Sequence, residues 1–285
     1  MNQKIKRQYN LESVVKIASN ENPYGPSKKV LDKAMELNNL KLYPDPAASL
    51  LVDTIANYHG LNSNQVFVGV GSDDVLAMAF MTFFNSGEKI LFPDITYSFY
   101  DVWAELFKIP YERMAVDENF RINAKDYYGE NGGVIFPNPN APTGLMTSVD
   151  EIEKIIRANK DVVVIVDEAY VDFGGESALG LIDKYDNLLV VQTFSKSRSM
   201  AGCRIGFAMG NPELIKYLED AKFSFNSYTM NHHALMLGAE SVRDRAYFEQ
   251  TVAKVVNTRE RVKKQLTELG FTFPDAMGNF IFASH

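Results

Sequence analysis

One lysine and one arginine stand eight residues apart around a polar bend in the second half of the chain. Lys196 follows the apolar run 188–191, and Arg204 comes directly before the apolar run 205–209. Each run has the length of a buried strand, and the segment 197–202 between them is mainly small or polar. We therefore expect both side chains at the mouth of a sheet, where an active site can form.

These two side chains suggest a particular chemistry. A lysine can form a Schiff base with a carbonyl group. Arg204, with the hydroxyl groups of Thr193 and Ser195 close to it in the sequence, can hold a phosphate. Pyridoxal 5′-phosphate carries both groups and is the cofactor we expect. Taken alone, Lys196 is more typical of a solvated loop, so the interpretation depends on further residues.

A third candidate, Asp167, follows an unbroken β-branched run at 162–166. A run without alternation is typical of a strand covered on both faces, as in a parallel sheet. The carboxylate could simply end this strand, but beside a pyridine nitrogen it would keep that nitrogen protonated and the ring electron-withdrawing. Tyr170 could then reach the phenolic oxygen of the ring. The interval of 29 residues from Asp167 to Lys196 (196 − 167) leaves room for a second strand of the same sheet.

Strand and helix patterns alternate along most of the chain, which predicts an α/β fold with three layers, helices on both faces of a mostly parallel sheet. After Pro212 the pattern becomes mainly helical, and we expect helices at 212–220, from about 230, and at 243–269, followed by two short apolar runs. The earlier helices are expected at 27–37, 49–58, 74–84, 97–107 and 149–159, and the earlier strands at 66–70, 89–92, 134–137 and 162–167.

Composition limits the classes of partner. The chain has 285 residues, 46% of them hydrophobic, and a formal charge of −7, which argues against a nucleic-acid partner. No apolar run has the length of a membrane span, and the segment 1–10 lacks the apolar core of a signal peptide. One cysteine, Cys203, allows no internal disulfide. We therefore expect a cytoplasmic protein that does not bind membranes.

Four motifs in order resemble the fold type I pyridoxal-phosphate aminotransferases, and most closely their histidinol-phosphate branch. The resemblance implies that fold, pyridoxal 5′-phosphate as cofactor, and a homodimer with shared active sites. It also implies an N-terminal arm at 1–26, a large cofactor-binding domain at 27–243, and the beginning of a small α+β C-terminal domain at 244–285. The motifs are ASNENPYGPS at 18–27, NPNAPTG at 138–144, DEAY at 167–170 and TFSKSRSMAGCRIGFA at 193–208.

The resemblance assigns further cofactor contacts. Ser72 and Asp73 would hold the phosphate, mainly through backbone amides at a helix start, although such residues are often plain N-caps. Tyr97 would lie against the pyridine ring, unless it is one more core aromatic. Tyr43 would reach the phosphate in the neighbouring subunit, and a Tyr-Pro pair is equally typical of a turn.

Two departures from the family pattern stand out. Ala141 replaces the asparagine that hydrogen-bonds the phenolic oxygen of the ring, so either Asn140 reaches in or Tyr170 holds that oxygen with less help. Relatives also continue beyond GNFIFA with an arginine for the substrate carboxylate, whereas this sequence ends at His285. Arg198 lies near Lys196, but no arginine of this sequence matches the missing one. We therefore expect an incomplete small domain.

The implied reaction is transamination. The family's histidinol-phosphate branch converts histidinol phosphate and 2-oxoglutarate to imidazole-acetol phosphate and glutamate, and Asn22 and Tyr24 would line the site mouth or belong to an arm that packs on a partner subunit. Lys196 would move the proton, which requires a lowered pKa. The alternatives are an aromatic aminotransferase, an amino-acid phosphate decarboxylase, or a non-catalytic cofactor-binding fragment. A nicotinamide-binding enzyme is disfavoured, because no G-x-G-x-x-G follows a strand.

Overall fold

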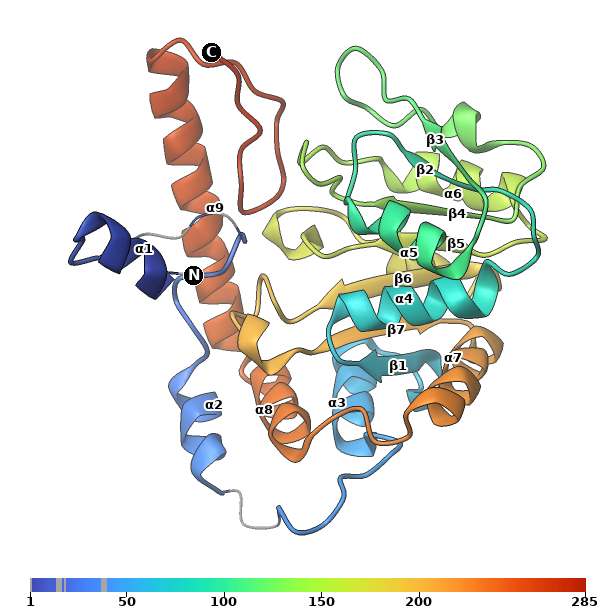
Figure 1. Ribbon diagram of the computed structural model, residues 1–285, viewed down its shortest axis with the longest axis horizontal. Coiled ribbons are helices and arrows are strands. Elements are labelled where there is room, and N and C mark those ends of the chain that lie inside the picture. The colour runs from blue at the N-terminus through green and yellow to red at the C-terminus, as the bar shows by residue number, and fades with distance from the viewer. Residues whose placement is uncertain (1, 14–16, 18, 37–39) are drawn as a thin grey trace.

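A seven-stranded sheet forms the centre of the molecule in the computed structural model, which describes residues 2–13, 17, 19–36 and 40–285 (Figure 1). The spatial order is β1-β7-β6-β5-β4-β2-β3. Strands β2 to β6 pair in parallel, whereas β7 is antiparallel to both β6 and β1. The strands are β1 Val66–Gly69, β2 Ile90–Pro93, β3 Tyr111–Met114, β4 Gly133–Pro137, β5 Val164–Asp167, β6 Leu188–Thr193 and β7 Gly206–Gly210.

Helices cover both faces of this sheet, which confirms the predicted three-layer α/β fold. Successive side chains of a strand point to opposite faces, so on β5 Val164 and Val166 face one core and Ile165 faces the other. Helices α3, α6 and α8 pack on the first face, and α4, α5 and α7 on the second. The helices are α1 Asn2–Tyr9, α2 Lys28–Lys33, α3 Ser49–His59, α4 Ser72–Phe83, α5 Phe99–Phe107, α6 Val149–Ala158, α7 Pro212–Phe225, α8 His232–Arg243 and α9 Arg245–Glu268.

Helix starts follow local capping chemistry. Ser27 accepts a hydrogen bond from the backbone N–H of Val30 at 3.3 Å, and Ser148 accepts one from Glu151 at 3.3 Å. Asn231 does the same for α8 through Ala234 N–H at 2.9 Å. These contacts satisfy amides that a helix leaves without partners. Helix α2 ends at Lys33 and continues as a 3-10 turn, Ala34–Glu36; Leu37, the expected helix end, lies outside the described residues.

The elements differ from the expectation in three places, one of which is the end of α7, at Phe225 instead of residue 220. Strand β3 was missed, because it is an edge strand with an intermediate or exposed position at every residue and with two adjacent charges, Glu112 and Arg113. The long helix expected from residue 243 begins instead at Arg245, because Asp244 leaves helical backbone geometry between α8 and α9.

Helix α9 stands beside the sheet and carries the C-terminal segment, which folds back along it (Figure 1). Arg259 fastens this part of the molecule, since its Nη1 donates to the backbone oxygens of Phe173 at 2.8 Å and Gly278 at 3.0 Å. A single bridge joins Thr272 to Ser284. Among the helices of the described ranges, none combines the length and apolar character that crossing a membrane requires.

Candidate active site

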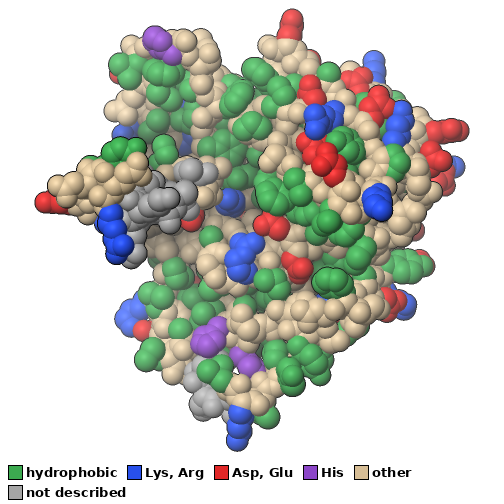
Figure 2. Space-filling view, in the orientation of Figure 1, with side chains coloured by type: hydrophobic (Ala, Val, Ile, Leu, Met, Phe, Trp, Pro, Cys, Tyr) green, Lys and Arg blue, Asp and Glu red, His purple; other side chains and the backbone are tan. Residues whose placement is uncertain are grey.

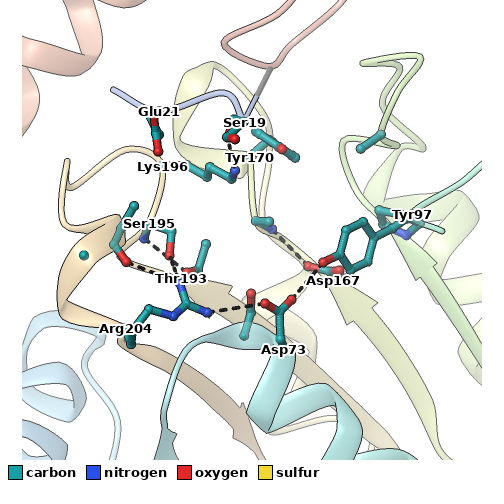
Figure 3. Close-up of a pocket in the computed structure, with 16 residues that line it drawn as sticks. Ser19, Glu21, Asp73, Tyr97, Asp167, Tyr170, Thr193, Ser195, Lys196 and Arg204 are labelled. Carbon is teal, nitrogen blue, oxygen red and sulfur yellow. Dashed lines mark hydrogen bonds and ion pairs between the residues drawn. The ribbon is translucent and has the colours of Figure 1, made fainter. Parts of the chain in front are cut away.

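A cavity of about 370 Å³ opens at the carboxyl ends of the parallel strands (Figure 3). Pro137, Asp167 and Thr193 line it from the ends of β4, β5 and β6. The start of α4 and residues 19 and 21 of the N-terminal arm complete it. Ligands of open α/β sheets bind outside the carboxyl ends of strands. In the face of the molecule that Figure 2 shows, basic and acidic side chains gather near the middle, with hydrophobic side chains around them.

Lys196 reaches into this cavity. It is half-buried, its Nζ donates to the backbone oxygen of Ser19 at 2.8 Å, and Nζ lies 5.5 Å from the centre of the Tyr170 ring. Burial lowers the pKa of the Lys196 amine, and the nearby Arg204 charge lowers it further, although the carboxylate of Asp73 opposes both. The direction is the one predicted from the sequence, and a lowered pKa leaves more of the amine neutral.

The N-terminus of α4 faces the same cavity without a side-chain cap. Its N-cap is Gly71, with φ +90°, and its first helical residues are Ser72 and Asp73. A Cβ atom on Gly206 of β7 would lie only 2.2 Å from the backbone nitrogen of Ser72. The absence of a side chain at position 206 therefore allows the strand to approach the helix terminus, whose amides and positive dipole end suit a phosphate.

Arg204 stands beside this terminus in the left-handed backbone region, with φ +51°. Its Nη2 donates to Asp73 Oδ2 at 3.3 Å, and its Nη1 donates to Ser195 Oγ at 3.4 Å. A Cβ on Gly71 would come within 2.4 Å of Nη2. The arginine side chain is 44% exposed and paired with Asp73. It is thus more open to solvent than a buried phosphate ligand would be.

Asp167 lines the cavity from the end of β5. It is 4% exposed, its Oδ2 accepts from Tyr100 Oη at 2.9 Å, and its Oδ1 accepts from Ala169 N–H at 3.2 Å. Burial raises the pKa of this carboxyl group to about 6, against the lowering effect of the Tyr100 hydrogen bond. A buried carboxylate of this kind is best stabilised by an opposite charge, which a protonated pyridine nitrogen would supply.

Two predicted tyrosines line the cavity between these ends. The hydroxyl of Tyr97 donates to Asp73 Oδ1 at 2.8 Å, and burial raises the pKa of Tyr97 well above its usual value. The hydroxyl of Tyr170 accepts from Asn20 Nδ2 at 3.1 Å. Figure 3 shows the Tyr97 ring and Lys196 on opposite sides of the pocket, with Asp73 and Arg204 at its base.

Asn140 lies differently from the sequence expectation. Its Nδ2 donates to the backbone oxygen of Ile95 at 2.9 Å and to Thr143 Oγ1 at 3.2 Å. The residue lines a separate cavity of about 440 Å³, whereas Ala141 lines the active-site cavity. The Asn140 side chain therefore does not enter the active-site cavity. Of the two candidates for contact with the phenolic oxygen of the cofactor, only Tyr170 lines that cavity.

Three more candidates lie outside the cavity lining. Tyr43 is 78% exposed and packs against Tyr228 with ring centres 4.6 Å apart. Asn22 donates from Nδ2 to the backbone oxygen of Ser197 at 3.3 Å, so it supports the loop of Lys196. Tyr24, 43% exposed, lines another cavity beside α9.

Sequence reasoning missed several lining or supporting residues. Ser19 and Glu21 come from the arm motif, and their place beside Lys196 depends on long-range packing. Tyr100, the partner of Asp167, could have been found, because in the helix expected at 97–107 it falls one turn after Tyr97; the observed α5 begins only at Phe99. Ala201 and Gly202 complete the wall near Arg204.

The lining fits pyridoxal 5′-phosphate in its chemistry. One end offers backbone amides, the hydroxyls of Thr193 and Ser195, and the Arg204 guanidinium for a phosphate. Asp167 offers a buried carboxylate for a ring nitrogen, and Lys196 offers an amine of lowered pKa for an aldehyde. The methyl group of Ala141 leaves one wall without a hydrogen-bond donor.

Two curated proteins are similar to this chain over nearly its whole length. The chain is 53% identical over 277 residues to histidinol-phosphate aminotransferase of Pseudomonas putida (strain W619), covering 96% of this chain and 80% of that protein. It is 52% identical over 273 residues to the enzyme of the same name from Clostridium beijerinckii, covering 95% and 76%. The chain thus spans roughly four fifths of the length of these curated relatives.

Solved structures share the fold. Histidinol-phosphate aminotransferase from Sinorhizobium meliloti, in complex with pyridoxal-5′-phosphate, superposes with a TM-score of 0.90 at 19% identity, covering 99% of this chain and 79% of that one. The enzyme from Clostridium acetobutylicum gives a TM-score of 0.85 at 26% identity, covering 94% and 82%. A family model described as aminotransferase class I and II matches residues 12–285. The chain therefore belongs to the aminotransferase class I and II family.

Proposed function

We propose that this protein is a pyridoxal-phosphate-dependent aminotransferase of histidine biosynthesis, which converts histidinol phosphate and 2-oxoglutarate to imidazole-acetol phosphate and glutamate. The observation that carries the proposal is the single cavity in which the Lys196 amine, the Asp167 carboxylate and the uncapped start of α4 all lie. The substrate follows from the relatives, which are about 50% identical and named histidinol-phosphate aminotransferases.

Bound pyridoxal 5′-phosphate supplies a carbonyl carbon that amines attack and a ring that accepts electrons. Lys196 would provide the amine that holds the cofactor covalently, and its Nζ would take the proton from the substrate α-carbon. Both tasks require a neutral amine, and the lowered pKa of Lys196 increases the neutral fraction at pH 7. Asp167, once ionised, stabilises a positive charge at the ring nitrogen.

The phosphate is held by the backbone amides of Ser72 and Asp73, the hydroxyls of Thr193 and Ser195, and the Arg204 guanidinium. Arg204 now donates to Asp73 Oδ2, so a bound phosphate competes with that carboxylate for the guanidinium. Tyr97 would lie against the cofactor ring, and Tyr170 would donate to its phenolic oxygen.

We further propose a homodimer with shared active sites. Tyr43 is 78% exposed and stands with Tyr228 near other exposed apolar side chains, which a second copy would cover. In this arrangement Tyr43 contributes to the phosphate site of the partner. Other exposed apolar side chains close in sequence to Tyr43 are Leu40 and Leu42, and those close in sequence to Tyr228 are Phe223 and Phe225.

We also propose that the chain is divided into three parts. Residues 1–26 form the arm, 27–243 the large domain, and 244–285 the beginning of a small domain. The start of α9 at Arg245 supports the second boundary. Asn22 and Tyr24 of the arm belong to the substrate entrance, and a reducing compartment such as the cytoplasm suits the single cysteine, Cys203.

The test combines absorption and peptide mapping. The purified protein is mixed with pyridoxal 5′-phosphate, and the visible band of a lysine-bound cofactor is recorded. Borohydride reduction and peptide mapping should then place the pyridoxyl label on Lys196. Histidinol phosphate should bleach the band, and 2-oxoglutarate should restore it. A label on a different lysine contradicts the site, and bleaching by phenylalanine but not by histidinol phosphate would make the protein an aromatic aminotransferase.

A further inference from the structure

Arg198, two residues after Lys196, lies in a cluster of three aromatic rings that the proposed chemistry does not use. Its guanidinium carbon is 4.3 Å from the centre of the Phe248 ring, 5.0 Å from Tyr58 and 5.3 Å from Phe194. Its Nη1 donates to the backbone oxygen of Ser241 at 3.1 Å. Cations over aromatic faces are attracted most strongly when little water separates them.

These contacts come from several separate elements. Tyr58 belongs to α3, Ser241 to the last turn of α8, and Phe248 to the first turn of α9. The space left beside Arg198 and Phe248 is about 10 Å³, near the minimum for a single water molecule. Close-packed groups transmit displacements instead of absorbing them. A tilt of α9 would therefore push on the guanidinium.

The loop on the other side of Arg198 carries the reactive amine. Ser197, 2% exposed, donates from Oγ to Asp172 Oδ2 at 2.5 Å. The backbone oxygen of Ser197 also accepts from Asn22 of the arm. The backbone that follows Lys196 is thus held at Ser197 by Asp172 and the arm. At Arg198 it is held by contacts with α8 and α9.

We propose that Arg198 is a positioning residue that couples the orientation of α9 to the placement of the Lys196 amine. The proposal rests on the proposed function, in which Lys196 is the cofactor lysine. Arg198 contacts neither the cofactor cavity nor the amine itself. It acts through the two-residue backbone link and through the ring of Phe248, so its loss leaves phosphate binding in place and misplaces Nζ.

The experiment compares four single variants and one double variant with the wild type, each reconstituted with pyridoxal 5′-phosphate. Arg198→Met removes the charge and the donor, and Arg198→Lys retains a cation. Arg245→Met is the matched control, because the Arg245 guanidinium lies 5.9 Å from the same Tyr58 ring but its side chain is 70% exposed. Phe248→Leu removes the ring on α9 and is also combined with Arg198→Met.

Three quantities are measured for each protein: the affinity for pyridoxal 5′-phosphate, and the limiting rate and the half-saturation of band bleaching by histidinol phosphate. Arg198→Met should lower the limiting rate about tenfold or more while cofactor affinity and half-saturation change less than about threefold, since misplacement of a reacting group by about 1 Å costs up to about a hundredfold. Arg198→Lys should recover part of the rate, and Arg245→Met should match the wild type. The double variant should be no slower than Arg198→Met alone.

Wild-type rates in Arg198→Met, or fully additive losses in the double variant, would overturn the coupling. If Arg198→Met does not fold, the proposal is tested with Arg198→Lys and Phe248→Leu. Unchanged limiting rates of bleaching in both variants would then overturn the coupling. Failure of the proposed function looks different, because the wild-type protein itself would then give no label on Lys196.

Discussion

Replacing Asp167 by asparagine should change the stability of the cofactor-free protein in a pH-dependent way. Burial raises the pKa of this carboxyl group from 3.8 to about 6. The native state therefore holds a proton that the unfolded chain releases between about pH 4 and pH 6. The contribution of this extra proton to the free energy of unfolding is complete below about pH 4 and is lost as the pH rises through about 6. The difference of about two pH units corresponds to about 3 kcal/mol, at about 1.4 kcal/mol per unit.

The asparagine is a close isostere and preserves the local contacts. Its oxygen can accept from Ala169 N–H, and its amide can donate to the Tyr100 hydroxyl, which replace the two hydrogen bonds of the carboxylate. Because the amide does not ionise, the Asp167→Asn protein avoids a buried charge above pH 6. We expect it to be more stable than the wild type at pH 7, by up to about 3 kcal/mol, and to gain no such advantage at pH 4.

Urea unfolding of both cofactor-free proteins between pH 4 and pH 8 tests this expectation. The same substitution at the exposed Asp161 is the control for a simple change of surface charge. A stability difference between Asp167→Asn and wild type that stays constant from pH 4 to pH 7 would refute the reasoning about burial. With cofactor bound, the variant should retain pyridoxal 5′-phosphate but transaminate slowly, because an amide cannot balance a charged ring nitrogen.

Three further substitutions test the rest of the cavity. Lys196→Ala should abolish borohydride-dependent labelling by pyridoxal 5′-phosphate, and a label that persists would place the covalent link elsewhere. Arg204→Ala should weaken cofactor binding about tenfold. This is the lower end of the range for loss of a hydrogen bond to a charged group, because the side chain is 44% exposed. Unchanged affinity in a titration would mean that the phosphate is held without Arg204. Gly206→Ala should destabilise the protein by about 1–3 kcal/mol in urea unfolding and impair cofactor binding, because its Cβ would meet Ser72 N at 2.2 Å. Gly180→Ala, with no atom within 4 Å of its Cβ, is the matched control outside the cavity lining, and equal stability of the two variants would argue against the close approach.

The central strands could be predicted from the sequence because their residue types are dominated by burial. The run before Asp167 and the run at 188–191 are apolar at every position, and the structure places them side by side in parallel. Strand β3 could not be found in this way, since an edge strand needs little apolar character and pairs along one side only. The end of α8 at Arg243 is likewise set by packing around Asp244 and not by a strong helix breaker.

The candidate site could be predicted where its residues are close in sequence to a strand end. Lys196 and Asp167 are of this kind, and both line the cavity. Ser19 and Glu21 could not be assigned, because they reach the cavity across more than 170 residues of chain. Asn140 was one of two alternatives left open for the phenolic oxygen, and although it is adjacent in sequence to the cavity lining, its side-chain amide donates to the backbone oxygen of Ile95.

The reversal of direction between β6 and β7 has a consequence for how this protein can change in length. Residues 194–205 form one connection of twelve residues between Thr193 and Gly206. It carries both the reactive amine and the guanidinium, so a single inserted or deleted residue would alter the distance between them. The loop at 115–123 carries neither group, so a change in its length would leave the distance between them unaltered. Natural insertions should therefore concentrate in such outer loops and avoid the connection that bears Lys196.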